Sequence, residues 1–202
     1  MAIIELAHIS LKNGLTASDP TLKKNLQEVK RVIEEYSKLQ TLFYTRIDDP
    51  TNMFVIGAWE SKDQHQHGFN GSPQQDEILD LIKDQMGIDW MHYMNVEPSR
   101  IPLNAPVLVI LKTVHNRDVH KLAFDNEFAA GTSTMGGARH GAVSAWNIPK
   151  DDKEHVVRVH FAGWDNVDEA MEAVSTAIAH TKRPRQQPLE VSFFFTERTG
   201  LD

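Results

Sequence analysis

The stretch Met53-Phe54-Val55-Ile56-Gly57-Ala58-Trp59-Glu60-Ser61-Lys62 has a counterpart in Arg158-Val159-His160-Phe161-Ala162-Gly163-Trp164-Asp165-Asn166-Val167. Both stretches lead from an apolar strand through small residues to a Trp and an acid, and a helical pattern follows each. They lie about a hundred residues apart in a chain of 202 residues. A similarity at half the chain length indicates that one structural unit occurs twice.

The flanking patterns repeat in the same order. In the first half we expect strands over residues 3–11, 42–47, 53–59 and 88–96, a helix that begins at Ser18-Asp19-Pro20, and a helical region over residues 62–86 that restarts at Ser72-Pro73. In the second half we expect strands over residues 107–114, 142–148, 155–164 and 189–196, with helices over residues 118–128 and 167–178. Both halves therefore have the order β-α-β-β-α-β, which is the ferredoxin-like motif.

Such a sheet has helices on one face, so its other face must be buried elsewhere. Residues 97–106 contain three prolines, which indicates a stiff connection. We therefore expect ferredoxin-like halves over residues 1–98 and 106–202, joined by a Pro-rich linker over residues 99–105. The two sheets are expected to face each other and to enclose a pocket.

Composition excludes several classes of protein. The chain has 41% hydrophobic and 24% charged residues, which is typical of a globular protein. The absence of cysteine excludes disulfides, Cys-ligated zinc, iron–sulfur clusters and a thiol nucleophile. A net charge of −7, with the densest basic cluster at Lys182, Arg183 and Arg185, disfavours nucleic-acid binding. No apolar run is long enough for a membrane span and residues 1–6 lack secretory features, so a cytoplasmic protein is predicted.

Residues 58–73 resemble the strand-to-helix signature of the antibiotic biosynthesis monooxygenase family. Trp59, Glu60, His67, Ser72 and Pro73 match that signature one by one. The family belongs to the dimeric α+β barrel superfamily, in which two protomers usually form the barrel. The resemblance thus implies an α+β fold in which two tandem ferredoxin-like halves form an intramolecular dimeric α+β barrel.

The resemblance also implies a function, namely cofactor-independent oxygenation of a polycyclic aromatic or polyketide-like substrate in secondary metabolism. The protein would deprotonate a phenol or anthrone, and the anion would react with oxygen. Two alternatives stay open on the same scaffold: a non-oxidative cyclase, lyase or isomerase, and a non-catalytic small-molecule-binding or stress-response protein. The expected partner is a small apolar or aromatic molecule, with no cofactor, and a homodimer of the tandem chain is an open possibility.

The second half departs from the signature. Trp164-Asp165 keeps the Trp-acid pair, but Ala170-Met171-Glu172 stands where the helix His is expected, and no Ser-Pro follows. This favours one asymmetric site, or one working half and one scaffold half. The superfamily's haem-degrading members use a His after the second helix segment, and none stands near residues 78–85.

Strand parity assigns candidate residues to faces, because alternate residues of a strand point to opposite sides. The apolar rows Val157, Val159, Phe161 and Phe54, Ile56, Ala58 are expected to meet the helices. The opposite rows, which include Trp59, Arg158 and His160, are then expected to face the barrel. The catalytic candidates are His67 and His160 as general bases, with Arg158 to stabilise an anion, whereas His65 is expected to be exposed.

Mixed aromatic and polar residues on strand faces are typical of a pocket for a flat, partly apolar ligand. The expected substrate-binding residues are Trp59, Tyr44, Trp90, His92, Ser144 and Trp146. No metal site is predicted, because none of the close His pairs has i, i+4 helical spacing with a Glu between. The Gly-rich residues 131–141 lack a Walker lysine and are interpreted as a surface loop or a lid.

Overall fold

The chain divides into two units, one of residues Met1–Pro98 with Thr196–Asp202 and one of residues Ser99–Phe195. The computed structural model describes residues 2–132, 138–149, 151, 155–180 and 187–201. Residues 133–137 of the Gly-rich stretch 131–141 and the basic cluster at 182–185 lie outside the described residues.

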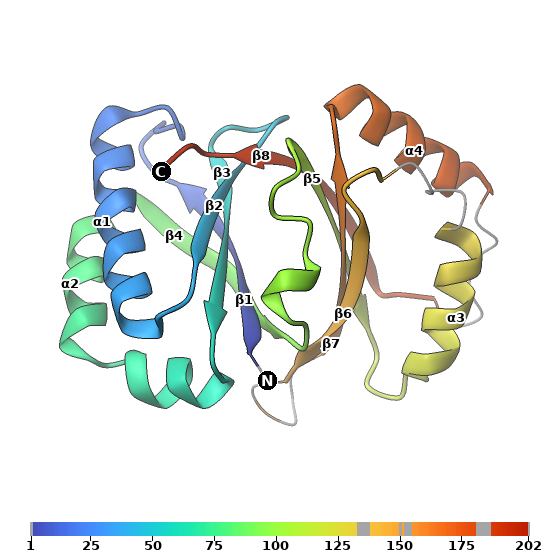
Figure 1. Cartoon of the computed structure of the whole chain (residues 1–202), viewed down its shortest axis with the longest axis horizontal. Helices are drawn as coiled ribbons and strands as arrows, with labels where there is room; N and C mark the ends of the chain where they lie inside the picture. Colours follow the sequence, from blue (N-terminus) through green and yellow to red (C-terminus); the bar gives the residue numbers. More distant parts are fainter. Residues whose placement is uncertain (1, 133–137, 150, 152–154, 181–186, 202) are drawn as a thin grey trace. The chain divides into compact units, whose positions relative to one another are not determined.

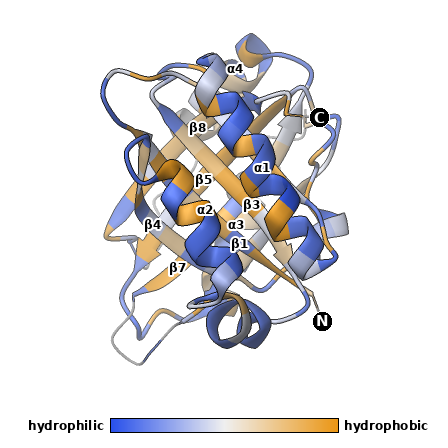
Figure 2. Ribbon diagram, turned by 90° about the vertical axis from the view of Figure 1, so that its left-hand side faces the viewer, coloured by the Kyte–Doolittle hydropathy of each residue, from blue (hydrophilic) through white to orange (hydrophobic). Residues whose placement is uncertain are grey.

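The first unit contains a four-stranded antiparallel sheet and three helical segments. Its strands follow the order β4-β1-β3-β2 across the sheet. The elements are β1 (Ile3–Leu11), α1 (Pro20–Ser37), β2 (Thr41–Arg46), β3 (Asn52–Trp59), the π-helix η1 (Gln64–Phe69), α2 (Pro73–Ile82) and β4 (Met86–Met94). Figure 1 shows α1 and α2 side by side on one face of this sheet, and in Figure 2 they lie in front of mainly hydrophobic strands.

The helix starts of the first unit follow the sequence signals. The side chain of Asp19 accepts hydrogen bonds from the main-chain N–H groups of Thr21 and Leu22, both at 2.9 Å, and Pro20 stands at the first helical position. Ser72 caps α2 in the same way through Gln75 N at 3.2 Å. The predicted interruption of the helical region before Ser72-Pro73 is therefore confirmed.

The second unit repeats the arrangement. Its strand order β8-β5-β7-β6 corresponds, position by position, to β4-β1-β3-β2 of the first unit. The elements are η2 (Pro98–Arg100), β5 (Val107–His115), α3 (Lys121–Thr132), β6 (Ala142–Ile148), β7 (Val156–Trp164), α4 (Val167–His180) and β8 (Glu190–Arg198). The fold class is therefore α+β with two tandem ferredoxin-like sheets, as predicted.

Strand β8 contributes to both units. Its last residues belong to the first unit, where Thr196, Glu197 and Arg198 pair antiparallel with β2. The main-chain N–H of Thr199 continues this pairing by donating to the carbonyl of Phe43 at 2.9 Å. The end of the chain therefore covers the β2 edge of the first sheet.

The predicted assignment of strand faces is wrong. In β3 it is Trp59 that meets the helices, with its ring 6.4 Å from that of Tyr36 in α1. Phe54 lies on the other face, where its ring contacts His8 and Trp90. The apolar rows gave the wrong assignment because β3 and β7 are buried on both faces, so the face with more apolar residues does not have to be the one that the helices cover.

None of the helices in the described part of the chain combines the length and apolar character that a membrane crossing needs.

Candidate functional site

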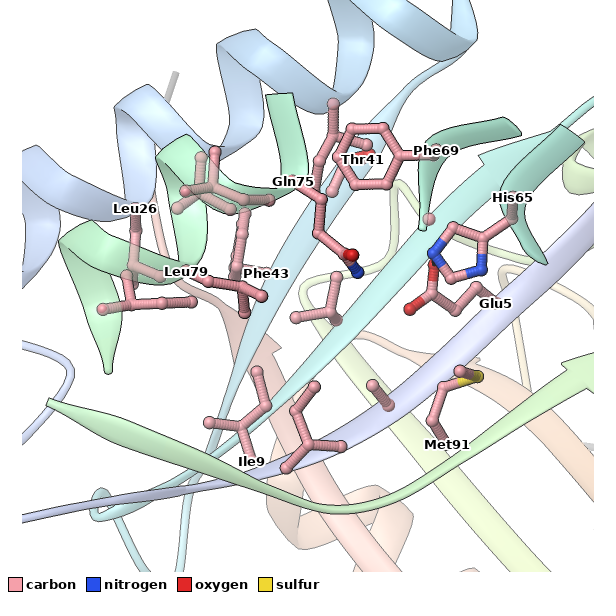
Figure 3. Close-up of a pocket in the computed structure, with 18 of the residues that line it drawn as sticks. Glu5, Ile9, Leu26, Thr41, Phe43, His65, Phe69, Gln75, Leu79 and Met91 are labelled. Atoms are coloured by element: carbon pink, nitrogen blue, oxygen red, sulfur yellow. Dashed lines mark ion pairs between the residues drawn. The ribbon is translucent and has the colours of Figure 1, made fainter. Parts of the chain in front are cut away.

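The first unit contains a pocket of about 190 Å³ between its helices and the helix-facing side of its sheet (Figure 3). Its wall is mostly aliphatic and is formed by α1, α2 and strands β1 to β4. These apolar lining residues are Ala7, Ile9, Leu26, Val29, Ile33, Phe43, Val55, Ile78, Leu79, Ile82, Met86, Ile88 and Met91. An enclosed apolar space of this kind, with a few polar groups, is typical of a small-molecule site.

The polar groups gather at one end of the pocket, where Figure 3 shows Glu5 next to His65 and far from Leu26. Glu5 Oε2 accepts a hydrogen bond from Trp59 Nε1 at 2.8 Å and lies 3.4 Å from His65 Nε2. The other ring nitrogen of His65, Nδ1, lies 2.8 Å from the hydroxyl of Tyr93. Glu5 is thus joined to Trp59 and His65, and His65 to Tyr93, in one largely buried group.

The π-helix η1 brings His65 to the pocket. The main-chain N–H of Asn70 donates to the carbonyl of His65 at 2.9 Å, which is the i to i+5 pattern of a π-helix. This wider turn places both His65 and Phe69 against Trp59, with ring centroids at 4.3 and 5.3 Å. Single π-turns occur frequently at functional sites.

His65, and not His67, is the buried histidine of η1. The side chain of His67 is 69% exposed and pairs with Asp63, 2.8 Å away, outside the pocket. The side chain of His65 is 7% exposed and lines the pocket. The expectation that His65 is exposed is therefore wrong, because η1 does not follow the α-helical spacing on which that expectation rests.

The pocket reaches the surface between α2 and β4. Two of its lining residues, Leu79 on α2 and Ile88 on β4, are 43% and 61% exposed. An exposed apolar rim is suited to the entry of an apolar molecule.

Three predicted binding residues of the first unit lie on the other face of the sheet. Trp90 stacks with His8 at 5.5 Å and with His92 at 5.3 Å between ring centroids. Tyr44 shares this face through its pairing with Phe54, and burial raises its pKa to about 12. Tyr44, Trp90 and His92 therefore do not line the pocket, whereas Trp59 does.

The predicted residues of the second unit come together under α3. Arg158 Nε donates to Asp125 Oδ1 at 2.7 Å, and Arg158 Nη2 donates to Ser144 Oγ at 2.7 Å. Ser144 Oγ lies 2.8 Å from His160 Nδ1, and Trp146 Nε1 donates to Asp125 Oδ2 at 2.8 Å. Arg158 and His160 therefore face a helix, and the expectation that they face away from the helices is wrong.

This network holds its histidines neutral. Burial, and then the positive charge of Arg158, lower the pKa of His160 to about 4. The same two causes lower the pKa of His115 to about 4, although Asp125 opposes the shift. Because Ser144 Oγ accepts from Arg158, its own proton points to His160 Nδ1, so this nitrogen is occupied within the protein.

The second unit lacks the polar group of the first. In the first unit Glu5 lies opposite Gly57, which is two residues before Trp59. In the second unit Val109 lies opposite Ala162, which is two residues before Trp164. Val109 and Ala162 therefore correspond to Glu5 and Gly57. Ala170 follows Trp164 by the same spacing with which His65 follows Trp59. Accordingly, Trp164 Nε1 is buried with no hydrogen-bond partner among the described residues. The two units thus differ at these positions, in the manner expected for one working half and one scaffold half.

The described residues contain no group of three or more His, Cys, Asp or Glu side chains that could hold a metal ion.

No protein-family model and no curated protein matches the sequence. Solved structures match it along almost its whole length. A mutant chlorite dismutase from Candidatus Nitrospira defluvii aligns with a TM-score of 0.63 and 10% identity, over 100% of this chain and 92% of that chain. A protein provisionally named a monooxygenase, from Fusobacterium nucleatum, aligns with a TM-score of 0.63 and 7% identity, over 98% and 92% of the two chains. An anthrone oxidase-like protein aligns with a TM-score of 0.51 and 9% identity, over 98% and 94%.

The chain shares its fold with these solved structures. At such low identity the likeness shows the fold alone, so the function has to be argued from the pocket. The membership of the antibiotic biosynthesis monooxygenase family in particular stays a prediction.

Sequence reasoning missed Glu5, His65 and Tyr93. Glu5 carried a signal, because it is a lone acid inside the apolar run Ile3-Ile4-Glu5-Leu6-Ala7. An acid on the buried face of a strand needs hydrogen-bond donors, and Trp59 and His65 provide them.

Proposed function

We propose that the first unit binds a small, largely apolar molecule with a polar head and removes a proton from it. The observation that carries this proposal is the Glu5–His65 pair at the polar end of a mostly apolar pocket. A carboxylate that is held in place beside an apolar binding surface can act as a general base toward a molecule bound there. The catalytic base is therefore assigned to this pair, in place of His67 and His160.

The hydrogen bonds define the role of each member. When the Tyr93 hydroxyl donates to His65 Nδ1, the ring proton sits on Nε2 and faces Glu5 Oε2. Trp59 Nε1 donates to the same oxygen. Both donors fix the carboxylate, so Glu5 is the proton acceptor, and His65 is a positioning residue that stabilises its charge.

The reaction class proposed for the deprotonated substrate is oxygenation. A methylene beside an electron-rich ring loses its proton to Glu5, and the resulting carbanion reacts with oxygen to form a carbon–oxygen bond. Loss of water then leaves a carbonyl, so one oxygen atom enters the product, the other leaves in water, and the substrate supplies all the electrons. The names monooxygenase and anthrone oxidase-like, carried by proteins of the same fold, support this choice.

The size of the pocket limits the substrate. A cavity of about 150 Å³ holds benzene, so a pocket of about 190 Å³ holds one substituted ring. A polycyclic or polyketide-like substrate of secondary metabolism would have to extend through the apolar rim at Leu79 and Ile88.

A non-oxidative isomerase, cyclase or lyase is the second candidate. It is favoured by the fact that the Glu5–His65 pair by itself provides proton transfer and nothing more.

The test measures oxygen consumption and product formation with a panel of anthrones and phenols, in air and under anaerobic conditions. Glu5→Gln should lower the rate by about 10²–10⁴-fold, the usual effect of losing a general base. Glu60→Gln removes an exposed acid next to Trp59 and should keep the wild-type rate. Equal rates for wild type and Glu5→Gln would refute the proposed base, and anaerobic turnover would favour the second candidate.

A further inference from the structure

We infer that the sheet surface above Gly57 is a seat for a hydroxyl group of the ligand, held between Thr41 and Glu5. The inference rests on the proposed function, since it concerns the same pocket, and it adds the chemical class of the ligand's head.

The seat is formed by three residues in a row across the sheet. In the strand register, Thr41 of β2 lies opposite Gly57 of β3, and Gly57 lies opposite Glu5 of β1. All three line the pocket. Because Gly57 has no side chain, the row has a gap in its middle, with a hydroxyl on one side and a carboxylate on the other.

The surface above Gly57 lies between the two oxygens and beside the indole nitrogen of Trp59. A Cβ added to Gly57 would lie 3.5 Å from Glu5 Oε2, 3.8 Å from Thr41 Oγ1 and 3.2 Å from Trp59 Nε1. A ligand atom that packs on Gly57 from the pocket lies farther out than such a Cβ, and we place the hydroxyl of the ligand there, between the two oxygens. Trp59 is fully buried against Tyr36 and Phe69, so the protein itself does not fill this space by moving the indole.

Thr41 has hydrogen-bonding capacity that the described residues do not use. Its side chain is fully buried, and its Oγ1 has no hydrogen-bond partner among the described residues. Its main-chain N–H is satisfied separately by Glu34 Oε1 at 2.8 Å. An unpaired buried hydroxyl is costly, so a ligand group that pairs with Thr41 Oγ1 gains affinity.

The two flanking groups select the head of the ligand. The carboxylate of Glu5 can only accept a hydrogen bond, whereas the Thr41 hydroxyl can donate one. A group that donates to Glu5 and accepts from Thr41 at the same time is a hydroxyl. A carboxylate would be repelled by Glu5, and an ether or a hydrocarbon has no proton to donate to it.

The second unit provides the natural comparison. The positions that match Thr41, Gly57 and Glu5 in register are Ala142, Ala162 and Val109. There the polar groups are absent and a methyl group fills the middle position. The seat is therefore specific to the unit that carries the pocket.

The test measures dissociation constants for four probes of similar size: 4-propylphenol, propylbenzene, 4-propylbenzoate and 4-propylbenzylamine. Binding is followed by calorimetry with the full chain. Wild type should bind 4-propylphenol at least about tenfold more tightly than propylbenzene, the factor expected for hydrogen bonds to a carboxylate and a buried hydroxyl. The benzoate should bind more weakly than the phenol.

Three variants separate the roles. Thr41→Val should weaken phenol binding about five- to tenfold and leave propylbenzene unchanged, while Thr41→Ser keeps the preference. Gly57→Ala should remove the preference by filling the seat, and its matched control Ala162→Gly in the second unit should have no effect. Thr41→Val should not lower the thermal unfolding temperature, because its hydroxyl has no partner among the described residues.

Each outcome has a defined meaning. If 4-propylphenol and propylbenzene bind equally and Thr41→Val changes neither dissociation constant, the proposed hydroxyl seat is wrong. The proposal that the pocket binds a small apolar molecule is then still supported. If the amine or the benzoate binds most tightly, the assigned head group is also wrong. If no probe binds at all, both the seat and the proposed small-molecule function are wrong. A loss of stability in Thr41→Val would assign the hydroxyl a structural role instead.

Discussion

Acidification should destabilise the second unit through two buried histidines. His160 and His115 have a pKa of about 4 in the folded protein, against about 6.5 in an unfolded chain. Between these values the unfolded chain binds more protons, so the free energy of unfolding rises with pH from about 4 to 6.5 and falls when the pH is lowered through this window. From pH 7 to pH 5 each histidine should remove about 2 kcal/mol, and together they should remove about 4 kcal/mol.

Urea unfolding at pH 7, 6 and 5 measures this loss. The variant His160→Gln keeps an acceptor for Ser144 but cannot titrate, so it should lose about 2 kcal/mol less than wild type over the same range. His67→Gln is the matched control, because it makes the same replacement at an exposed histidine outside the second unit. If His160→Gln shows the wild-type pH dependence, the buried neutral state of His160 is wrong.

Two substitutions test packing in the second unit. Asp125→Ala leaves Arg158 buried without its carboxylate and should cost about 2–3 kcal/mol, somewhat below the cost for a fully buried pair because Asp125 is 38% exposed. Glu28→Ala, at an exposed pair, is the matched control and should leave the thermal unfolding temperature nearly unchanged. Gly163→Ala would place a Cβ 2.7 Å from the nearest atom of another residue and should cost at least about 1–3 kcal/mol of stability. Gly87→Ala is the control and should be tolerated, because its Cβ would lie 3.7 Å from the nearest atom. Equal melting temperatures for the two variants would contradict the close approach of other residues to Gly163.

The order of elements could be predicted from the sequence because its signals are local. Asp19-Pro20 and Ser72-Pro73 mark helix starts by capping chemistry that acts within one turn. The repeated Trp-acid junction places β3 and β7 at equivalent positions of the two halves without reference to any contact. Neither signal depends on what packs against the strands.

The faces of the strands could not be predicted in this way, since their assignment depends on distant residues. Arg158 lies under α3 because Asp125 on that helix provides its carboxylate, 33 residues earlier in the chain. The sequence pattern suggests that Leu122 is buried in this helix, yet it is 66% exposed. The side of α3 that meets the sheet is marked instead by Phe124, which is buried against His115 and Trp146.

The site could be predicted in part. Trp59 was predicted to line a pocket and does so, although on the other face of its strand, whereas the choice between His65 and His67 depended on the type of helix. An α-helix and a π-helix differ by about one residue per turn, which is enough to exchange a buried histidine for an exposed one.

The shared strand β8 has a consequence for the timing of synthesis. The residues that cover the edge of β2 are synthesised only after the whole second unit, so β2 is an unpaired edge strand until then. At about 5–20 residues per second the ribosome needs on the order of 5–20 s for that interval. During this time the edge of β2 can pair with a strand of another nascent chain, which makes exchange of β8 between molecules the characteristic error of biogenesis for this architecture.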